Sequence, residues 1–158
     1  MPQPGESIKK ILSERKLTIS AAESCTGGRV SDHITNISGS SAYFLGGVVA
    51  YGNQAKIALL GVDEKSLEDH GAVSCEVAEE MAVGCRRAFR SDIAVSTTGV
   101  AGPTGGTPSK PVGLVWFGVS DGDRTITDRV IFSGDRESIK EEASVHALDL
   151  VLRFLGGN

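Results

Sequence analysis

Hydrophobic and polar positions follow two different periods along this chain. Apolar residues at helical spacing predict helices over 5–16, 28–37, 53–60, 63–69 and 74–90, and a last helix that begins at Asp135. Short apolar runs bounded by glycine, serine or asparagine predict strands over 18–22, 44–51, 92–98, 113–120 and 124–133. Strands that alternate with helices in this way are typical of an α/β protein.

The C-terminal part of the sequence predicts that the sheet is not wholly parallel. Asp121-Gly122-Asp123 separates the last two predicted strands and is typical of a hairpin turn, so at least one strand pair is antiparallel. We therefore expect one domain over residues 1–158. Its predicted fold is a three-layer α/β/α sandwich with a mixed sheet of about five strands, a C-terminal hairpin and a final helix.

Four polar motifs follow predicted strands. They are Glu23–Gly28, Tyr51–Lys56, Thr98–Lys110 and Ser133–Arg136. In open α/β sheets, ligands bind at the carboxyl ends of strands, where loops lead into helices. The sequence therefore predicts that these four motifs converge on one site.

Composition narrows the range of functions. The net charge is −4 and no basic stripe is present, which argues against binding of nucleic acid. Apolar runs are too short for a membrane span, the N-terminus has no signal-peptide pattern, and three cysteines show no CxxC spacing. We expect a cytoplasmic protein without disulfides. His33, His70 and His146 lack the spacing of metal ligands, so we predict no metal.

The stretch "AAESCTGG" places hydroxyls and a thiol where a strand gives way to a helix. Ser24 is a candidate nucleophile there, because N–H groups at a helix N-terminus stabilise an oxyanion and glycines admit a substrate. The alternative is a capped turn with Thr26 as N-cap. Cys25 is a second candidate nucleophile, although no histidine lies in any motif.

Lys56 falls in the first turn of a predicted helix for which Asn53 is the expected N-cap. The positive end of the helix dipole disfavours a cation there, so the pKa of Lys56 should be lowered, as a general base requires. The alternative is an ordinary solvated lysine.

The stretch "TGVAGPTGGTPSKPVG" holds five glycines and three prolines, so it predicts a loop. It matches neither a Walker A motif nor GxGxxG. Its exposed N–H groups, Lys110 and the guanidinium of Arg136 form a candidate phosphate clamp. The alternatives are a plain loop and a surface arginine.

Five stretches taken together resemble a known family. They are "TISAAESCTGG", "SSAYFLGGVVAYGNQAKIALLGV", "HGAVS", "TTGVAGPTGGTPSKPVG" and "SGDR". Their order and length resemble the CinA C-terminal-domain family, the nicotinamide-nucleotide amidases. Some relatives carry an additional N-terminal domain, so the chain is similar to the stand-alone form. It departs from the family pattern at Val100, where isoleucine is usual, and at Lys140, where arginine is common. We expect neither difference to affect the chemistry.

The resemblance implies hydrolysis of the carboxamide of nicotinamide mononucleotide to nicotinate mononucleotide and ammonia, with no cofactor. Ser24 would be the nucleophile, with Thr26 as the other candidate hydroxyl, Lys56 the general base and Tyr51 its hydrogen-bonding partner. Thr26 and two glycines would form the oxyanion site. The expected substrate-binding residues are Gly27, Gly28, Asn53, Thr98, Gly102, Gly105, Gly106, Lys110 and Arg136.

The resemblance also implies a homodimer. Two other functions remain open at this stage: a nucleotide-binding module without turnover, and an interaction protein connected with competence or DNA damage.

Overall fold

The computed structural model of the protein describes residues 3–156. Its helices are α1 (Pro4–Arg15), α2 (Arg29–Thr35), α3 (Asn53–Leu60), α4 (Glu64–His70), α5 (Cys75–Phe89) and α6 (Arg136–Phe154), with a short 3-10 helix η1 (Ser40–Ala42). Its strands are β1 (Ile19–Glu23), β2 (Phe44–Val49), β3 (Ile93–Gly99), β4 (Leu114–Ser120) and β5 (Thr125–Ile131).

The five strands form one mixed sheet in the order β2-β1-β3-β4-β5. The β1 strand pairs in parallel with both β2 and β3, whereas β4 runs antiparallel to β3 and to β5. Strands β1, β2, β3 and β5 therefore point in one direction. Their carboxyl ends meet at the same edge of the sheet.

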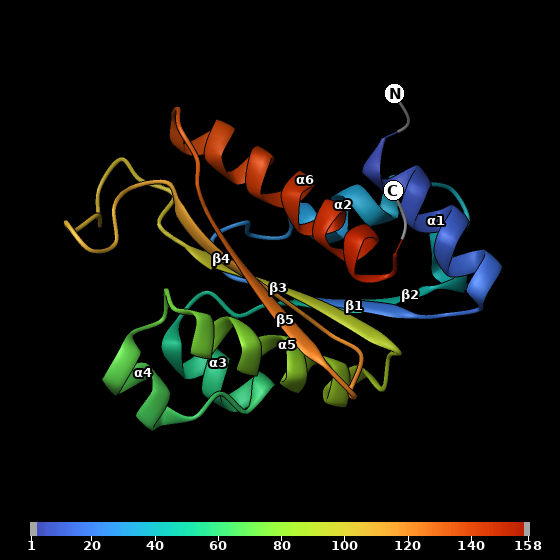
Figure 1. Ribbon diagram of the computed structural model, residues 1–158, viewed down its shortest axis with the longest axis horizontal. Coiled ribbons are helices and arrows are strands. Elements are labelled where there is room, and N and C mark those ends of the chain that lie inside the picture. Colours follow the sequence, from blue (N-terminus) through green and yellow to red (C-terminus); the bar gives the residue numbers. More distant parts are fainter. Residues whose placement is uncertain (1–2, 157–158) are drawn as a thin grey trace.

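Helices cover both faces of this sheet (Figure 1). Helices α1, α2 and α6 lie on one face, and α3, α4 and α5 lie on the other. The predicted three-layer α/β/α sandwich, with its mixed sheet, C-terminal hairpin and final helix, is confirmed.

The neighbouring parallel strands β1 and β3 are buried on both faces, so they pack against the helices of both outer layers. On β3, Ile93 and Val95 join the core beneath α1, α2 and α6, while Ala94 joins the core beneath α3 and α5. This alternation follows from the two-residue period of a strand. Polar side chains on these strands are hydrogen-bonded, as when Ser96 Oγ donates to the Ala78 carbonyl at 2.6 Å. The centre of the sheet is thus closely packed on both faces.

Several predicted boundaries shift by one or two residues. The helix expected over 28–37 ends at Thr35, and the strand expected over 44–51 ends at Val49. The shorter strand leaves Ala50 and Tyr51 in a connection whose carbonyls are free to accept from a side chain. The prediction that Asn53 caps α3 is wrong: Gly52 is the N-cap, and no side chain caps this helix.

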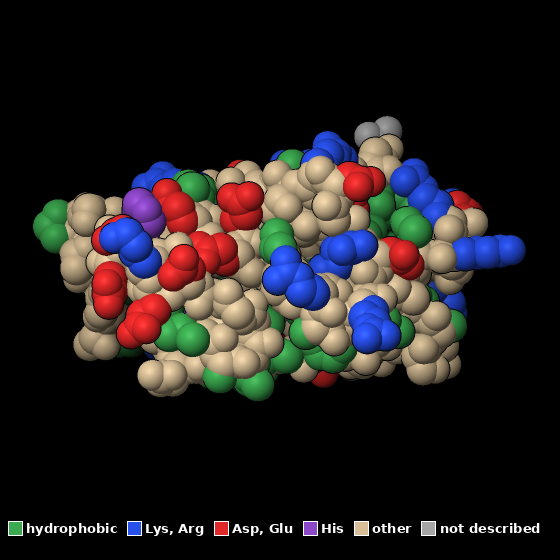
Figure 2. Space-filling model, turned by 90° about the horizontal axis from the view of Figure 1, so that it is seen from below, with side chains coloured by type: hydrophobic (Ala, Val, Ile, Leu, Met, Phe, Trp, Pro, Cys, Tyr) green, Lys and Arg blue, Asp and Glu red, His purple; other side chains and the backbone are tan. Residues whose placement is uncertain are grey.

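Charge is segregated on the face covered by α3, α4 and α5. Figure 2 shows acidic side chains gathered toward one end of this face and lysines and arginines toward the other. The last turn of α5 carries Arg86 and Arg87, whereas α4 carries several acids. No helix within residues 3–156 has the length and apolar character needed to cross a membrane.

Candidate active site

The predicted convergence of the four polar motifs is confirmed. The motifs 23–28, 51–56 and 98–110 follow the carboxyl ends of β1, β2 and β3, which are adjacent in the sheet. The fourth motif follows β5 and leads into α6. This edge of the sheet is the candidate active site.

Ser24 and Lys56 are in direct contact there. Lys56 Nζ lies 3.1 Å from Ser24 Oγ, 3.0 Å from the Ala50 carbonyl oxygen and 2.9 Å from that of Tyr51. The two carbonyls can only accept, so they take two N–H groups of the amine. The third position of the amine faces the serine hydroxyl. As an ammonium, Nζ donates to Ser24 Oγ. A neutral Lys56 that keeps both carbonyl contacts would turn its lone pair toward Ser24 instead.

The Lys56 side chain is 1% exposed, which excludes the alternative of a solvated lysine. Burial lowers the pKa of Lys56 from its ordinary value of 10.5, and the nearby Cys25 thiol opposes this shift. No carboxylate within residues 3–156 lies within 4 Å of this amine. Burial without an anionic partner favours the neutral amine that proton abstraction requires.

The turn after β1 is organised by Glu23, a carboxylate that is only 1% exposed. Its Oε1 accepts from the N–H groups of Gly28 and Val30, and its Oε2 accepts from the N–H and the hydroxyl of Ser31. Oε1 also accepts from Thr26 Oγ1 at 2.7 Å. Glu23 therefore neutralises the N-terminus of α2 and fixes the turn that carries Ser24.

This arrangement changes the expected oxyanion site. The N–H of Gly28 is taken by Glu23, and the N–H of Gly27 donates to the Ser24 carbonyl at 3.1 Å, so neither glycine offers a free donor. Within residues 3–156, the N–H groups of Cys25 and Thr26 donate to no other residue. These two donors follow the candidate nucleophile directly in the chain.

Thr26 is not the cap of α2, whose N-cap is Gly28. The Thr26 side chain is fully buried, and its hydroxyl contacts Thr97 Oγ1 at 2.8 Å as well as the Glu23 carboxylate. Its proton is held by Glu23 rather than by an amine. Between the two hydroxyls left open by the sequence, the geometry of a nucleophile–base pair belongs to Ser24.

The side chain of Thr98 points to the face of β3 opposite to that of Thr97, and the residue is 1% exposed. Its hydroxyl donates to the Ala72 carbonyl at 2.8 Å, so it ties β3 to the segment before α5. The neighbouring Thr97 is the residue of this strand that reaches the Ser24 turn, since its carbonyl accepts from the Ser24 N–H at 3.1 Å.

The Tyr51 side chain faces away from Lys56, and only the Tyr51 carbonyl contacts that amine. The phenol is exposed, and its oxygen accepts from Arg136 Nη2 at 3.1 Å. The Arg136 Nη1 donates to the Gly102 carbonyl at 2.5 Å. Arg136 thus joins the motifs from β2, β3 and β5 at the rim of the site.

Lys110 does not join Arg136 in a clamp. Its amine donates to the His70 carbonyl at the end of α4, which fastens the 100–112 loop to that helix. Gly105 and Gly106 lie in the exposed part of the loop, which projects beyond the sheet in Figure 1. The exposed Asn53 lines a surface hollow beside α4.

Cys25 is a core residue. It is 6% exposed and packs in the core cluster beneath α1, α2 and α6. Burial raises the pKa of its thiol to about 12, so the thiolate that nucleophilic attack requires is scarce at neutral pH.

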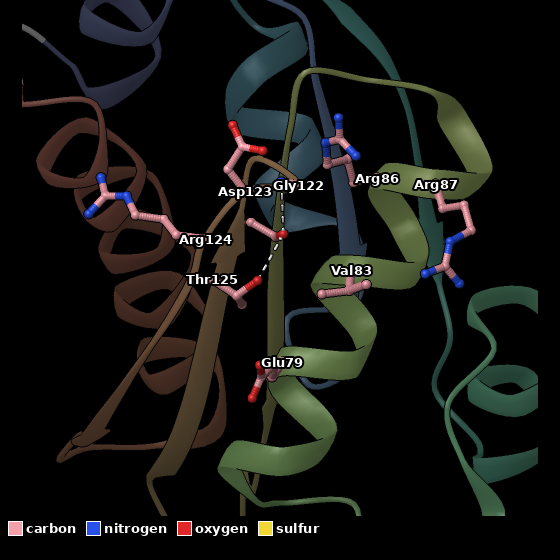
Figure 3. A pocket seen from close by; sticks show the side chains of 9 residues that line it. Glu79, Val83, Arg86, Arg87, Gly122, Asp123, Arg124 and Thr125 are labelled. Atoms are coloured by element: carbon pink, nitrogen blue, oxygen red, sulfur yellow. Dashed lines mark hydrogen bonds between the residues drawn. The ribbon is translucent and has the colours of Figure 1, made fainter.

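A second hollow lies at the opposite edge of the sheet, between α5 and the β4–β5 turn (Figure 3). Arg86 donates to the Asp92 carbonyl, and Arg124 donates to the Phe154 carbonyl and lies over the Phe154 ring. Figure 3 shows the Arg124 side chain pointing away from α5, the helix that carries Arg87. The cations of this hollow do not converge.

Within the described residues, no group of three His, Cys, Asp or Glu side chains is placed to hold a metal ion. Sequence reasoning assigned no role to Glu23 or Thr97. Glu23 lies in the stretch "AAESCTGG", and an acid shortly before a helix is the signal that could have identified its role, because acids stabilise a helix N-terminus. Thr97 had no signal beyond its place in a strand.

Comparison with known proteins gives concordant matches over nearly the whole chain. The model of the CinA C-terminal domain matches residues 3–155. The nicotinamide-nucleotide amidohydrolase PncC of Escherichia coli is 48% identical over 147 residues, which cover 92% of this chain and 89% of that protein. A CinA-like protein of Chloroherpeton thalassium is 52% identical over 157 residues.

This match covers 97% of the present chain and 37% of the length of that CinA-like protein. Among solved structures, the competence damage-inducible protein A of Klebsiella pneumoniae superposes with a TM-score of 0.94 at 32% identity, covering 98% of each chain. Sequence and fold therefore agree on the same group of relatives.

Proposed function

Because this chain belongs to the CinA C-terminal domain family, we propose that it hydrolyses the carboxamide of nicotinamide mononucleotide to nicotinate mononucleotide and ammonia. The similarity to the amidohydrolase of Escherichia coli supports this substrate, since nearly the whole of both chains is matched. The observation that carries the proposal is the buried contact between Lys56 Nζ and Ser24 Oγ, at 3.1 Å.

In the first half of the reaction, neutral Lys56 takes the proton of Ser24 as Oγ attacks the carboxamide carbon. The carbonyl oxygen becomes an oxyanion, for which the N–H groups of Cys25 and Thr26 are the available donors. The Lys56 ammonium then gives its proton to the amide nitrogen. The C–N bond breaks, ammonia leaves, and the acyl group of the mononucleotide is held as an ester on Ser24.

In the second half, Lys56 is neutral again and takes a proton from water as the water oxygen attacks the ester carbon. A second oxyanion forms at the same place. Its collapse breaks the bond to Ser24 Oγ, which recovers its proton from Lys56. Each proton that Lys56 accepts is returned within the cycle, so no external acid or base is needed.

The rest of the site serves substrate binding. Arg136 presents a planar fork at the rim. Within residues 3–156, two of its five N–H groups are engaged, by Gly102 and Tyr51. The remaining donors suit a phosphate. We assign the ester phosphate of the substrate to Arg136 rather than to Lys110, whose amine is engaged at α4.

The test is ammonia release from nicotinamide mononucleotide by the purified protein, with chromatographic detection of nicotinate mononucleotide in equal amount. Ser24→Ala should abolish both products. Ser41→Ala, at an exposed serine of η1, is the matched control and should retain them. Binding of the mononucleotide without release of ammonia would instead identify a binding module.

A further inference from the structure

Lys140 shares a helix face with Arg136. The two residues are four positions apart on α6, so their side chains lie one turn apart on the same side of the helix. Arg136 on this face reaches Tyr51 and Gly102 at the rim of the site. This face of α6 therefore carries two cationic side chains, Arg136 and Lys140.

The Lys140 ammonium lies over the turn that carries the nucleophile. A Cβ placed on Gly27 would be 3.4 Å from Lys140 Nζ and 3.8 Å from Cε. Gly27 is exposed, follows Ser24 by three residues and has a positive φ of 60°. Lys140 also lowers the pKa of the Cys25 thiol, against the larger effect of burial. The positive charge of Lys140 therefore acts on this corner of the site.

No carboxylate in the described part of the chain balances this charge. Within residues 3–156, no carboxylate lies within 4 Å of the Lys140 ammonium. The acids on either side of it are engaged elsewhere: Glu137 pairs with Arg29 at 3.1 Å, and Glu141 pairs with Arg29 at 3.2 Å and with His33 at 2.8 Å. Lys140, a half-buried residue beside the turn that carries Ser24, is thus available to an anion from outside the chain.

We propose that Lys140 is a second cation of the phosphate subsite and that, together with Arg136, it selects substrates that carry a dianionic monophosphate ester. The proposal rests on the proposed function, because the phosphate belongs to the substrate assigned above. A phosphate monoester carries a charge between −1.5 and −2 at pH 7, so one guanidinium leaves it incompletely neutralised. Arg136 supplies directional donors, and Lys140 supplies a point charge that adapts to the remaining oxygen.

The test compares nicotinamide mononucleotide with nicotinamide riboside, which has the same carboxamide but no phosphate. Lys140→Met should raise KM for the mononucleotide at least about tenfold, the scale of a lost charge-assisted hydrogen bond, with kcat nearly unchanged. The kinetics with the riboside should not change. Lys140→Arg should restore KM, since it keeps the charge, and Lys10→Met on α1 is the matched control for loss of one exposed lysine.

Two results would overturn the proposal. A loss of kcat of equal size for both substrates would place Lys140 at the reacting carboxamide, and unchanged KM for the mononucleotide would make it a surface residue. Lys140→Gln repeats the comparison if the methionine variant folds poorly.

A binding measurement separates this proposal from the proposed function. Calorimetric titration of the wild-type protein with ribose 5-phosphate and with ribose needs no turnover. If the protein releases no ammonia but binds ribose 5-phosphate in a Lys140-dependent manner, the proposed function fails and the phosphate subsite stands. If ammonia is released and Lys140→Met binds ribose 5-phosphate as tightly as wild type, the subsite fails alone.

Discussion

Lys56 Nζ and Ser24 Oγ lie 3.1 Å apart although 32 residues separate them in the chain. The amine approaches from the first turn of α3, and the hydroxyl from the turn after β1. Two backbone carbonyls, those of Ala50 and Tyr51, hold the amine in this orientation. The connection after β2 provides both carbonyls and therefore orients the Lys56 amine toward the Ser24 hydroxyl.

Loss of either partner should abolish turnover. We expect Ser24→Ala and Lys56→Met each to lower kcat by about 10²-fold or more, because each removes the nucleophile or its base. The double variant should be scarcely slower than either single variant, since residues that act as a unit are not additive. Steady-state kinetics would measure this, with circular dichroism to confirm folding. Substantial activity in a folded single variant would assign the chemistry elsewhere.

The pH dependence of kcat/KM should report Lys56. Its pKa is lowered by burial, and only the neutral amine accepts a proton, so activity should rise with pH through an apparent pKa below 10.5. At pH values below that pKa, Lys56 is an ammonium and the rate should fall tenfold per pH unit. A profile that rises only near the ordinary lysine pKa would show that the site does not activate this amine.

Cys25 should be dispensable for the chemistry. Cys25→Ala should retain most of the activity, because burial raises the thiol pKa to about 12 and no thiolate is available at neutral pH. The truncation removes a packed sulfur, so a modest loss of thermal stability is expected. Iodoacetamide should also leave the native wild-type protein active. An inactive but correctly folded Cys25→Ala variant would contradict this view of the thiol.

Glu23 should act as a positioning residue. In Glu23→Gln, the amide NH₂ would face donors that now meet a carboxylate oxygen, so two or more hydrogen bonds of the turn would be lost. We expect a loss of about 1–3 kcal/mol in the free energy of unfolding, measured by urea denaturation.

The same variant should also show a lower kcat for nicotinamide mononucleotide, while the apparent pKa of the pH–rate profile stays unchanged. That unchanged pKa separates positioning from acid–base chemistry, because Glu23 contacts the turn and not the Lys56 amine. Glu14→Gln, on the exposed part of α1, is the matched control. A shifted apparent pKa would instead make Glu23 part of the proton transfer.

The layers of this protein could be predicted from local sequence patterns. Hydrophobic period is a local property, so the spacing of Val77, Met81 and Cys85 was enough to predict a helix with one buried face, and all three are buried in α5. The hairpin at Asp121-Gly122-Asp123 was also predictable, because turn chemistry depends on the turn residues themselves. The convergence of the four polar motifs followed from the rule that parallel strands end at one edge.

The contacts that each residue of these motifs makes could be read only from the three-dimensional structure. Lys110 and Arg136 are equally cationic in sequence, yet one is engaged at the end of α4 and the other lies at the rim of the site. Glu23 accepts from the N–H of Gly28, which was expected to bind an oxyanion, because a carboxylate before the turn can reach the start of α2. Lys140 lies beside Gly27 because α6 packs against α2, which begins directly after Gly28. Such assignments depend on distances between residues far apart in the chain, and local pattern carries no information about them.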